Sequence, residues 1–217
     1  MTGLESFNSK KLSGIERNSF NPDKLSEKKW DFNRKTEGFN PDKLSEEKFD
    51  FSKTEFQSEY NDRISQTPRN GERGCWSGER GESIYKPSDN EITEKLNKYE
   101  LSGIEYRNGI PDFSKVSVET LEIGKMTGQR EGPGGNFEQA DTKLSDKWNK
   151  EGRDGRTDWS AGDVRDWRKA NGYSWHERND MKTMDLAPTK IHQYFSHFGG
   201  CGECNIRDSK IKEEFDE

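Results

Sequence analysis

All three histidines of the 217-residue chain lie close together near its C-terminal end, between Tyr173 and Cys204. They are His176, His192 and His197. An imidazole titrates near neutral pH and is also a common ligand of first-row metal ions, so one histidine can act as a general base while others hold a cation. Hydrolysis of a phosphodiester needs a base that activates water and a cation opposite the charge that builds on the phosphate. The cluster therefore predicts a site for metal-assisted phosphodiester hydrolysis.

The residues around these histidines predict a strand, a turn, a second strand and a helix. Residues 173–177 are rich in aromatic side chains, as a short strand would be, and the Asn-Asp pair within 178–181 is typical of a tight turn. Polar and apolar residues alternate over 182–187, which predicts the returning strand of a hairpin. A helix should follow over 189–198 and stop at the glycine pair 199–200. This unit would carry one histidine on its first strand and two on its helix.

The spacing of His192 and His197 is unusual for two ligands on a single helix. At about 3.6 residues per turn, a separation of five positions places two side chains on different faces, whereas about three or four would align them. Either the helix is distorted near His197, or His197 lies at its fraying end.

The residues that surround the histidines resemble a known family of nucleases. In chain order the pattern is Trp175-His176-Glu177, Thr183-Met184-x-Leu186-x-Pro188, Ile191-His192, His197 and Gly199-Gly200. In residue types, order and spacing it is similar to the WHE branch of the HNH/endonuclease VII nucleases, which are found as toxin tips of bacterial polymorphic toxins. Upstream, residues 76–83 and 103–114 resemble the segment that precedes such domains in secreted toxins. The resemblance implies an α+β fold with a ββα-metal core at about residues 172–200.

The same resemblance implies roles for individual residues. His176 would be the general base, His192 a metal ligand, and His197 a second ligand or a phosphate contact. Glu177 would complete the metal set or orient His176, and Thr183 stands where these nucleases often place a residue that orients the base. The cofactor would be one divalent metal ion: Mg, Mn, Ni or Zn.

The implied activity is that of an endonuclease toxin used in interbacterial competition. It would hydrolyse phosphodiester bonds in DNA, with RNA as the second choice of substrate. Its partners would be the nucleic acid and a cognate immunity protein of the producing cell. It would be secreted or delivered into target bacteria and act in their cytoplasm.

Two cysteines after the predicted helix support a different interpretation. Cys201 and Cys204 have the spacing of a zinc half-site, and with His192 and His197 they would supply four ligands for a closed tetrahedral ion. Such a site is structural and leaves no position for water. It also leaves His176 and its Trp-His-Glu context unexplained, so we prefer the nuclease. A further alternative, an inactive interaction module whose N-terminal repeats bind a partner, explains none of the histidines.

The composition limits how the chain can meet a nucleic acid. Apolar residues make up 26% and charged residues 36%, a balance too poor in apolar side chains for the whole chain to form one core. The net charge of −6 has the wrong sign for a protein that coats nucleic acid, because phosphate binding relies on Lys and Arg. Contacts with phosphate must therefore be local. Arg130, Arg153 and Arg156, which lie in glycine-rich segments, are the candidates.

The N-terminal part of the chain is repetitive. Residues 20–32 return with few changes at 39–51, and each copy has too few apolar side chains to form a core. We expect a repetitive, poorly ordered linker or passenger region over 1–68, a nuclease toxin domain over 69–205 and a charged tail over 206–217. No apolar run approaches the ~20 residues of a membrane helix, and the start of the chain has no apolar core of a classical signal peptide.

Other patterns predict the elements that hold the histidine unit in place. Apolar spacing predicts helices, and alternation around an Asn108-Gly109 turn predicts strands of a small sheet. The predicted elements are helices at 91–99, 137–150 and 161–170, strands at 104–106 and 116–123, and a glycine-rich surface loop at 124–135.

Overall fold

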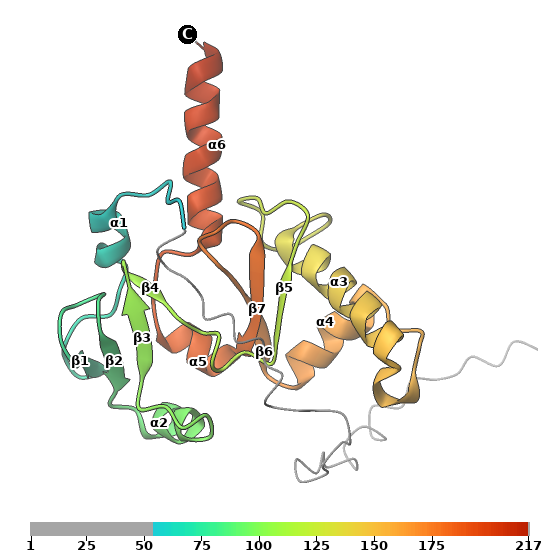
Figure 1. Cartoon of the computed structure of the whole chain (residues 1–217), viewed down its shortest axis with the longest axis horizontal. Helices are drawn as coiled ribbons and strands as arrows, with labels where there is room; N and C mark the ends of the chain where they lie inside the picture. The colour runs from blue at the N-terminus through green and yellow to red at the C-terminus, as the bar shows by residue number, and fades with distance from the viewer. Residues whose placement is uncertain (1–53, 217) are drawn as a thin grey trace, which may run out of the picture. The chain divides into compact units, whose positions relative to one another are not determined.

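Two antiparallel β-sheets with flanking helices make up the part of the chain that the computed structural model describes, residues 54–216. The first sheet has the strand order β1-β2-β3-β4 and the second the order β5-β7-β6 (Figure 1). This arrangement confirms the predicted α+β class. The repeats at 20–32 and 39–51 lie outside the described residues. Within 54–216, no helix is both long enough and apolar enough to cross a bilayer.

The first sheet is built from the N-terminal part of the described chain and has two short helices beside it. Its elements are α1 (Tyr60–Ser65), β1 (Gly74–Trp76), β2 (Ile84–Pro87), α2 (Asn90–Asn97), β3 (Ile104–Arg107) and β4 (Ile110–Pro111). The Asp89 side chain caps α2 by accepting a hydrogen bond from the Ile92 backbone N–H. Between β3 and β4, Asn108 and Gly109 have φ values of 52° and 77°, which is the left-handed pair that a two-residue hairpin turn requires.

The second sheet contains the hairpin that carries the first histidine. Strands β6 (Tyr173–Glu177) and β7 (Thr183–Pro188) pair antiparallel, as predicted, and β5 (Glu119–Glu122) pairs with the other edge of β7. The expectation that segments 104–106 and 116–123 share one small sheet is wrong. The second of these segments finds its partner in β7, and its hydrogen bonds continue from the Val118 N–H to Leu186 O and from the Ile123 N–H to Lys182 O.

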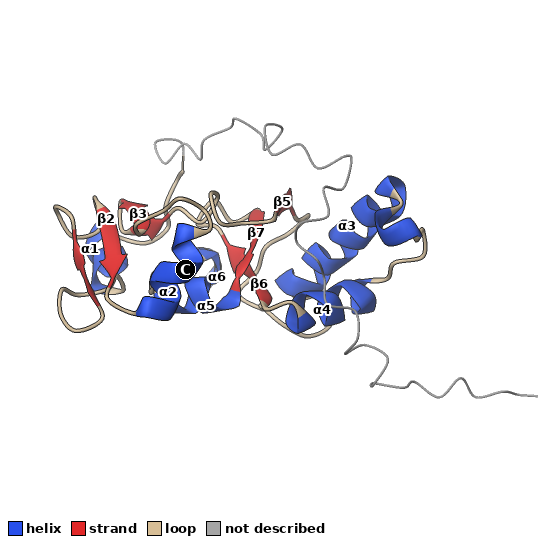
Figure 2. Ribbon diagram, turned by 90° about the horizontal axis from the view of Figure 1, so that it is seen from below, coloured by secondary structure: helices blue, strands red, loops and turns tan. Residues whose placement is uncertain are grey.

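Two long helices cover one side of the second sheet. They are α3 (Asn136–Glu151) and α4 (Ala161–Ala170), joined by the short 3₁₀ helix η4 (Arg153–Gly155), and they lie together beside β5 and β6 (Figure 2). A capping box between Ser160 and Asp163 starts α4. Both helices follow the predicted ranges closely because each presents a regular apolar face to the core.

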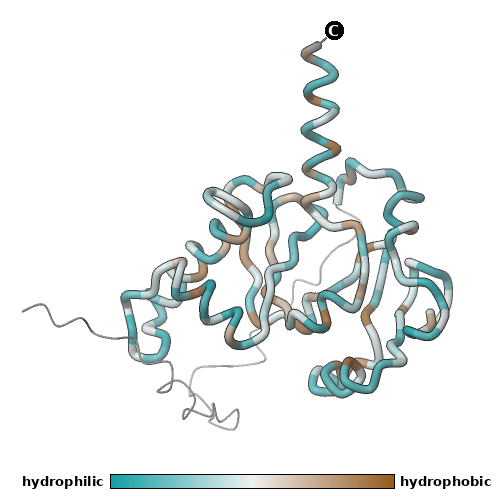
Figure 3. The backbone as a smooth tube through the Cα atoms, turned by 180° about the vertical axis from the view of Figure 1, so that it is seen from behind, coloured by the Kyte–Doolittle hydropathy of each residue, from teal (hydrophilic) through white to brown (hydrophobic). Residues whose placement is uncertain are grey.

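The helix predicted over 189–198 is shorter in the structure, and a second helix that was not predicted follows it. Helix α5 (Thr189–Tyr194) ends where Phe195 adopts a non-helical backbone with φ −95° and ψ 87°, and α6 (Gly200–Asp216) begins at the glycine pair that was expected to end a helix. A Cβ on Gly200 would lie 2.3 Å from Arg178 O, so only glycine allows α6 to start this close to the hairpin. Helix α6 continues through the charged tail predicted over 206–217 and ends at Asp216. Its far part extends beyond the rest of the domain and mixes hydrophilic with hydrophobic residues (Figure 3).

Strand β7 contributes to two hydrophobic cores. Met184 and Leu186 pack with Trp175 and residues of α3 and α4 in one core. Ala187 packs with α5 and aromatic residues of the first sheet in the other. Because neighbouring side chains in a strand point to opposite faces, His176, which pairs with Asp185, faces the side of the first sheet.

A candidate metal centre of three histidines

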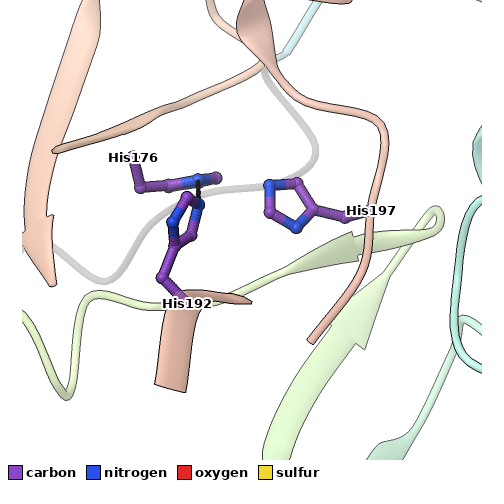
Figure 4. Close-up of side chains that lie close together, drawn as sticks. All are labelled: His176, His192 and His197. Carbon is purple, nitrogen blue, oxygen red and sulfur yellow. Dashed lines mark hydrogen bonds between the residues drawn. The ribbon is translucent and has the colours of Figure 1, made fainter. Parts of the chain in front are cut away.

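The three histidines that are scattered over strand, helix and loop come together in space (Figure 4). His176 lies on β6, His192 on α5, and His197 in the connection between α5 and α6. One ring nitrogen from each lies within 4.8 Å of the other two, and His176 Nδ1 is 3.3 Å from His192 Nε2. Among residues 54–216, no other group of three or more His, Cys, Asp or Glu side chains converges in this way.

The end of α5 resolves the awkward spacing of His192 and His197. The helix ends before His197, so the two rings need not share a helical face. The non-helical Phe195 turns the chain, and His197 Nδ1 donates a hydrogen bond to Phe195 O at 2.9 Å. Since a carbonyl can only accept, the proton sits on Nδ1, and Nε2 keeps the lone pair that a metal ion would use.

The distance between His176 and His192 fits a shared metal ion. Two nitrogens bound to a tetrahedral ion at about 2.0–2.1 Å lie about 3.3 Å apart. The observed separation of 3.3 Å matches this value, and the nitrogen of the third imidazole lies within 4.8 Å of the other two. The three side chains therefore supply the donor atoms of a metal centre, and His176 and His192 already have its spacing.

The surroundings keep the three imidazoles in the neutral form that binds metal. Burial lowers the pKa of His176 well below its usual value, and the neighbouring histidines lower it further. Burial also lowers the pKa of His192 to about 3 and that of His197 to about 4. At neutral pH each ring is therefore uncharged, with one N–H and one lone pair, and the His176–His192 contact is a hydrogen bond whose proton a metal ion would replace.

One phenylalanine that the sequence did not single out forms a wall of the site. Phe113 is fully buried, and its ring lies edge-on to all three histidines, with centroid distances of 4.8 Å to His176, 5.3 Å to His192 and 5.6 Å to His197. It follows β4 and lies in the upstream block 103–114. An apolar wall here excludes water from one side of the rings, which is one reason that burial lowers their pKa values.

Glu177 does not join the converging nitrogens. Its buried carboxylate accepts hydrogen bonds from Arg130 Nε at 2.8 Å, from Asn136 Nδ2 at 3.0 Å and from Cys201 Sγ at 2.9 Å. Arg130 remains 54% exposed along its side chain, and its charge contributes to the lowered pKa of each histidine. Glu177 therefore fixes a half-exposed arginine beside the three imidazoles.

A second arginine lies next to His176 on the same face of the sheet. Asp185 pairs with His176 across the strands and holds Arg178 through two oxygens, with Arg178 Nη2 at 2.7 Å from Asp185 Oδ1. Thr120 on β5 donates to the same carboxylate at 2.6 Å. The positive charge of Arg178 also lowers the pKa of His176. The sequence does not reveal this group, because the cross-strand register that assembles it depends on the fold.

The other residues predicted to act in the site lie elsewhere. Thr183 donates its hydroxyl hydrogen to Asp180 Oδ2 at 2.6 Å, and so holds the hairpin turn. Arg153 stacks on Trp148 and Trp167, and Arg156 stacks on Trp159. Both arginines follow the C-terminal end of α3, whose 16 residues at about 1.5 Å each place that end about 24 Å from the end that carries Asn136.

The structure does not assemble the four ligands of the alternative structural zinc site. The Cys201 thiol donates to Glu177, and Cys204 is buried in the core formed with α3 and α4. Burial and the nearby Glu177 raise the pKa of Cys201 to about 12, so the thiol stays protonated. The reason is geometric: the cysteines lie on α6, a separate helix from the one that carries His192.

Comparison with known proteins gives a result that agrees with this geometry. Residues 103–199 match the family model Colicin-DNase, described as the DNase/tRNase domain of colicin-like bacteriocin. This range contains all three histidines, Arg130 and Glu177. No curated protein and no solved structure matches the chain. The family match supports a nuclease toxin domain over residues 103–199.

Proposed function

We propose that this domain is a metal-dependent endonuclease of the HNH type, with a ββα-metal core formed by β6, β7 and α5. Its substrate would be DNA, with RNA as the second choice. The observation that carries the proposal is the convergence of three neutral imidazoles beside an arginine that is fixed but still exposed. That arrangement lies within the residues that resemble a DNase/tRNase domain.

The donor set favours some divalent ions over others. Imidazole nitrogens suit Zn²⁺ and Ni²⁺, whereas Mg²⁺ and Mn²⁺ prefer carboxylate, carbonyl and water oxygens. The converging group supplies three nitrogens and no carboxylate. We therefore propose one ion, Zn²⁺ or Ni²⁺ ahead of Mg²⁺ or Mn²⁺. When bound, such an ion polarises a phosphate and offsets the negative charge that develops during hydrolysis.

We propose His192, His197 and His176 together as the ligands. The role of His176 differs here from the general base that the family resemblance implies. His176 Nδ1 points into the same group as the His192 nitrogen, at 3.3 Å. Its pKa is also lowered far from neutrality, and a base is most effective when its pKa lies near the working pH. Both features suit a ligand better than a base.

Arg130 is the proposed contact for the phosphate that is cleaved. The ion pair with Glu177 fixes the guanidinium through Nε, and a planar guanidinium is well suited to phosphate oxygens. Glu177 would thus act by positioning Arg130, and Thr183 by holding the turn between β6 and β7. Arg153 and Arg156, as phosphate contacts, would serve parts of the substrate away from the cleaved bond.

The proposed biological role is that of a toxin in competition between bacteria. The similarity to a bacteriocin domain supports a protein that is released or delivered into target cells and acts on nucleic acid in their cytoplasm. A producing cell would then need an immunity protein. Such a partner could protect the cell by covering the histidines or Arg130.

The direct test is a cleavage assay with the purified full-length chain. Supercoiled plasmid and structured RNA are each incubated with protein that has been stripped with EDTA and then supplied with Mg²⁺, Mn²⁺, Ni²⁺ or Zn²⁺. We expect plasmid cleavage that returns with Ni²⁺ or Zn²⁺ and that the His192→Ala variant lacks. Failure to cleave either substrate with any of these ions, or cleavage that EDTA does not reduce, would refute the proposal.

A further inference from the structure

The chain around His197 is held on both sides by side chains from distant parts of the domain. His197 lies in the irregular connection between α5 and α6. Just before it, the Tyr106 hydroxyl donates to Ser196 O at 3.1 Å. Just after it, Asn179 Nδ2 donates to Phe198 O at 2.8 Å. A residue that no helix or strand constrains is therefore fixed through the backbone of its two neighbours.

The Tyr106 hydroxyl and the Asn179 amide nitrogen are both buried, and each can act only as a hydrogen-bond donor toward this segment. Tyr106 is fully buried, and burial raises the pKa of its hydroxyl well above the usual value, so the hydroxyl keeps its proton. Asn179 is also fully buried, and the two groups that face its nitrogen, Phe198 O and Glu203 Oε1, can only accept. Its Oδ1 has no hydrogen-bond partner within the described chain. A buried amide oxygen without a partner lowers stability. An asparagine at this position therefore has another use, which is to hold Phe198 O and Glu203 through its nitrogen.

The second acceptor of Asn179 connects it to the segment that precedes α1. Glu203 near the start of α6 is fully buried, and Asn179 Nδ2 donates to its Oε1 at 3.0 Å. The same carboxylate accepts from Ser58 Oγ at 2.6 Å, from the Ser58 N–H at 2.9 Å and from the Gln57 N–H at 2.7 Å. Three of the four donors to Glu203 thus come from residues far from it in sequence.

We propose that Tyr106 and Asn179 are positioning residues for His197, and that Ser58 sets the position of Asn179 through Glu203. The inference rests on the proposed metal centre, because it assigns these residues to the placement of one of its ligands. A ligand on an irregular segment must be ordered before it can bind. If neighbouring side chains order it in advance, metal binding is tighter. Groups hydrogen-bonded to a ligand itself typically change affinity by about 10–100-fold, and for contacts one residue away from the ligand we expect the lower end of that range.

The test measures Zn²⁺ affinity of the full-length chain by competition with a chromophoric chelator. We expect Asn179→Ala and Tyr106→Phe each to weaken Zn²⁺ binding about tenfold or more. Ser58→Ala should have a smaller effect, because two backbone donors to Glu203 remain. In the double variant of Ser58 and Asn179, the two effects should not add, because Ser58 acts on the segment around His197 only by way of Asn179.

Asn149 provides a matched control. It is an amide that bridges two segments, with Nδ2 donating to Trp159 O at 2.8 Å and Oδ1 accepting from the Trp159 N–H at 2.6 Å. It lies near the C-terminal end of α3, away from the histidines. Asn149→Ala should lower the melting temperature and leave Zn²⁺ affinity at the parent value. Circular dichroism melts in EDTA identify any variant that is unfolded at the temperature of the titration.

The outcomes separate this inference from the proposed function. Parent-like Zn²⁺ affinity in both Asn179→Ala and Tyr106→Phe would overturn the positioning role. Tyr106→Phe removes only a hydroxyl and keeps the buried ring, so it decides the matter even if Asn179→Ala does not fold. His197→Ala reports on the metal centre itself. If the parent binds no Zn²⁺, or if His197→Ala binds it as well as the parent, the metal centre and this inference are both refuted.

Discussion

Replacing His176 with alanine distinguishes a metal ligand from a general base. As a ligand, His176 supplies one of three nitrogens that converge within 4.8 Å. Its loss should weaken metal binding, and nuclease activity should partly return when more metal is added. As a base, its loss should leave metal binding unchanged and remove activity at every metal concentration. The geometry predicts the first pattern.

The size of the effect follows from the number of ligands. Structural Zn²⁺ sites bind with about 10–16 kcal/mol through four protein ligands, so one ligand contributes on the order of 3 kcal/mol, or about 100-fold in Kd. A lost base would instead lower kcat by about 10²–10⁴-fold with no change in Kd. The two roles differ by about two orders of magnitude in metal affinity, which a competition titration resolves easily.

The assay pairs a Zn²⁺ titration with plasmid cleavage at low and at saturating metal. His192→Ala serves as the reference, because His192 is a ligand under either assignment of His176. Melts in EDTA show whether the loss of the ring that packs against Phe113 has disturbed the fold. A His176→Ala protein that is folded, binds Zn²⁺ within about twofold of the parent and is inactive at saturating metal would refute the ligand assignment.

Three further predictions concern the arginine, the N-terminal boundary and pH. Arg130→Ala should lower cleavage by about 100-fold without changing Zn²⁺ affinity, and recovery of full activity in Arg130→Lys would argue against a fixed guanidinium contact. Deletion of residues 1–53 should leave the melting temperature unchanged. Deletion of 1–68 should lower the free energy of unfolding by at least about 2 kcal/mol, because Glu203 loses three of its buried donors. Equal melting temperatures for the two deletion variants would contradict this. The three histidines have lowered pKa values in the folded protein, so below about pH 6.5 the unfolded chain binds more protons than the folded one. In EDTA, the free energy of unfolding should therefore fall as the pH drops toward about 4. A variant with all three changed to glutamine should show a shallower fall in denaturant melts.

Local patterns predicted the elements around the histidines well. The alternation over 182–187 and the turn residues before it specify a hairpin without help from the rest of the chain, and β6 and β7 form as predicted. The two-residue turn at Asn108-Gly109 is equally local, because both residues tolerate a positive φ. In both cases the conformational preference lies within a few adjacent residues.

Features that depend on distant contacts could not be predicted in this way. The early end of α5 is set by the backbone contacts of the segment that follows it, and the sequence has no proline or glycine there to mark it. Phe113 and Asp185 reach the site through tertiary packing and cross-strand register. Cys201 and Cys204 matched a zinc spacing, but the fold gives their thiols other neighbours. A spacing alone does not fix which atoms meet.

Strand β7 is buried on both faces, which makes it the least tolerant of insertions and deletions. Met184 and Leu186 enter one core while Ala187 enters the other, and Asp185 lies between them beside His176. One added or missing residue before Met184 would exchange the two faces. It would turn the Asp185 carboxylate into the core formed with α3 and α4, and at the same time withdraw it from Arg178. Length variation should therefore be confined to the loops, such as the glycine-rich stretch at 124–135, and be absent from this strand.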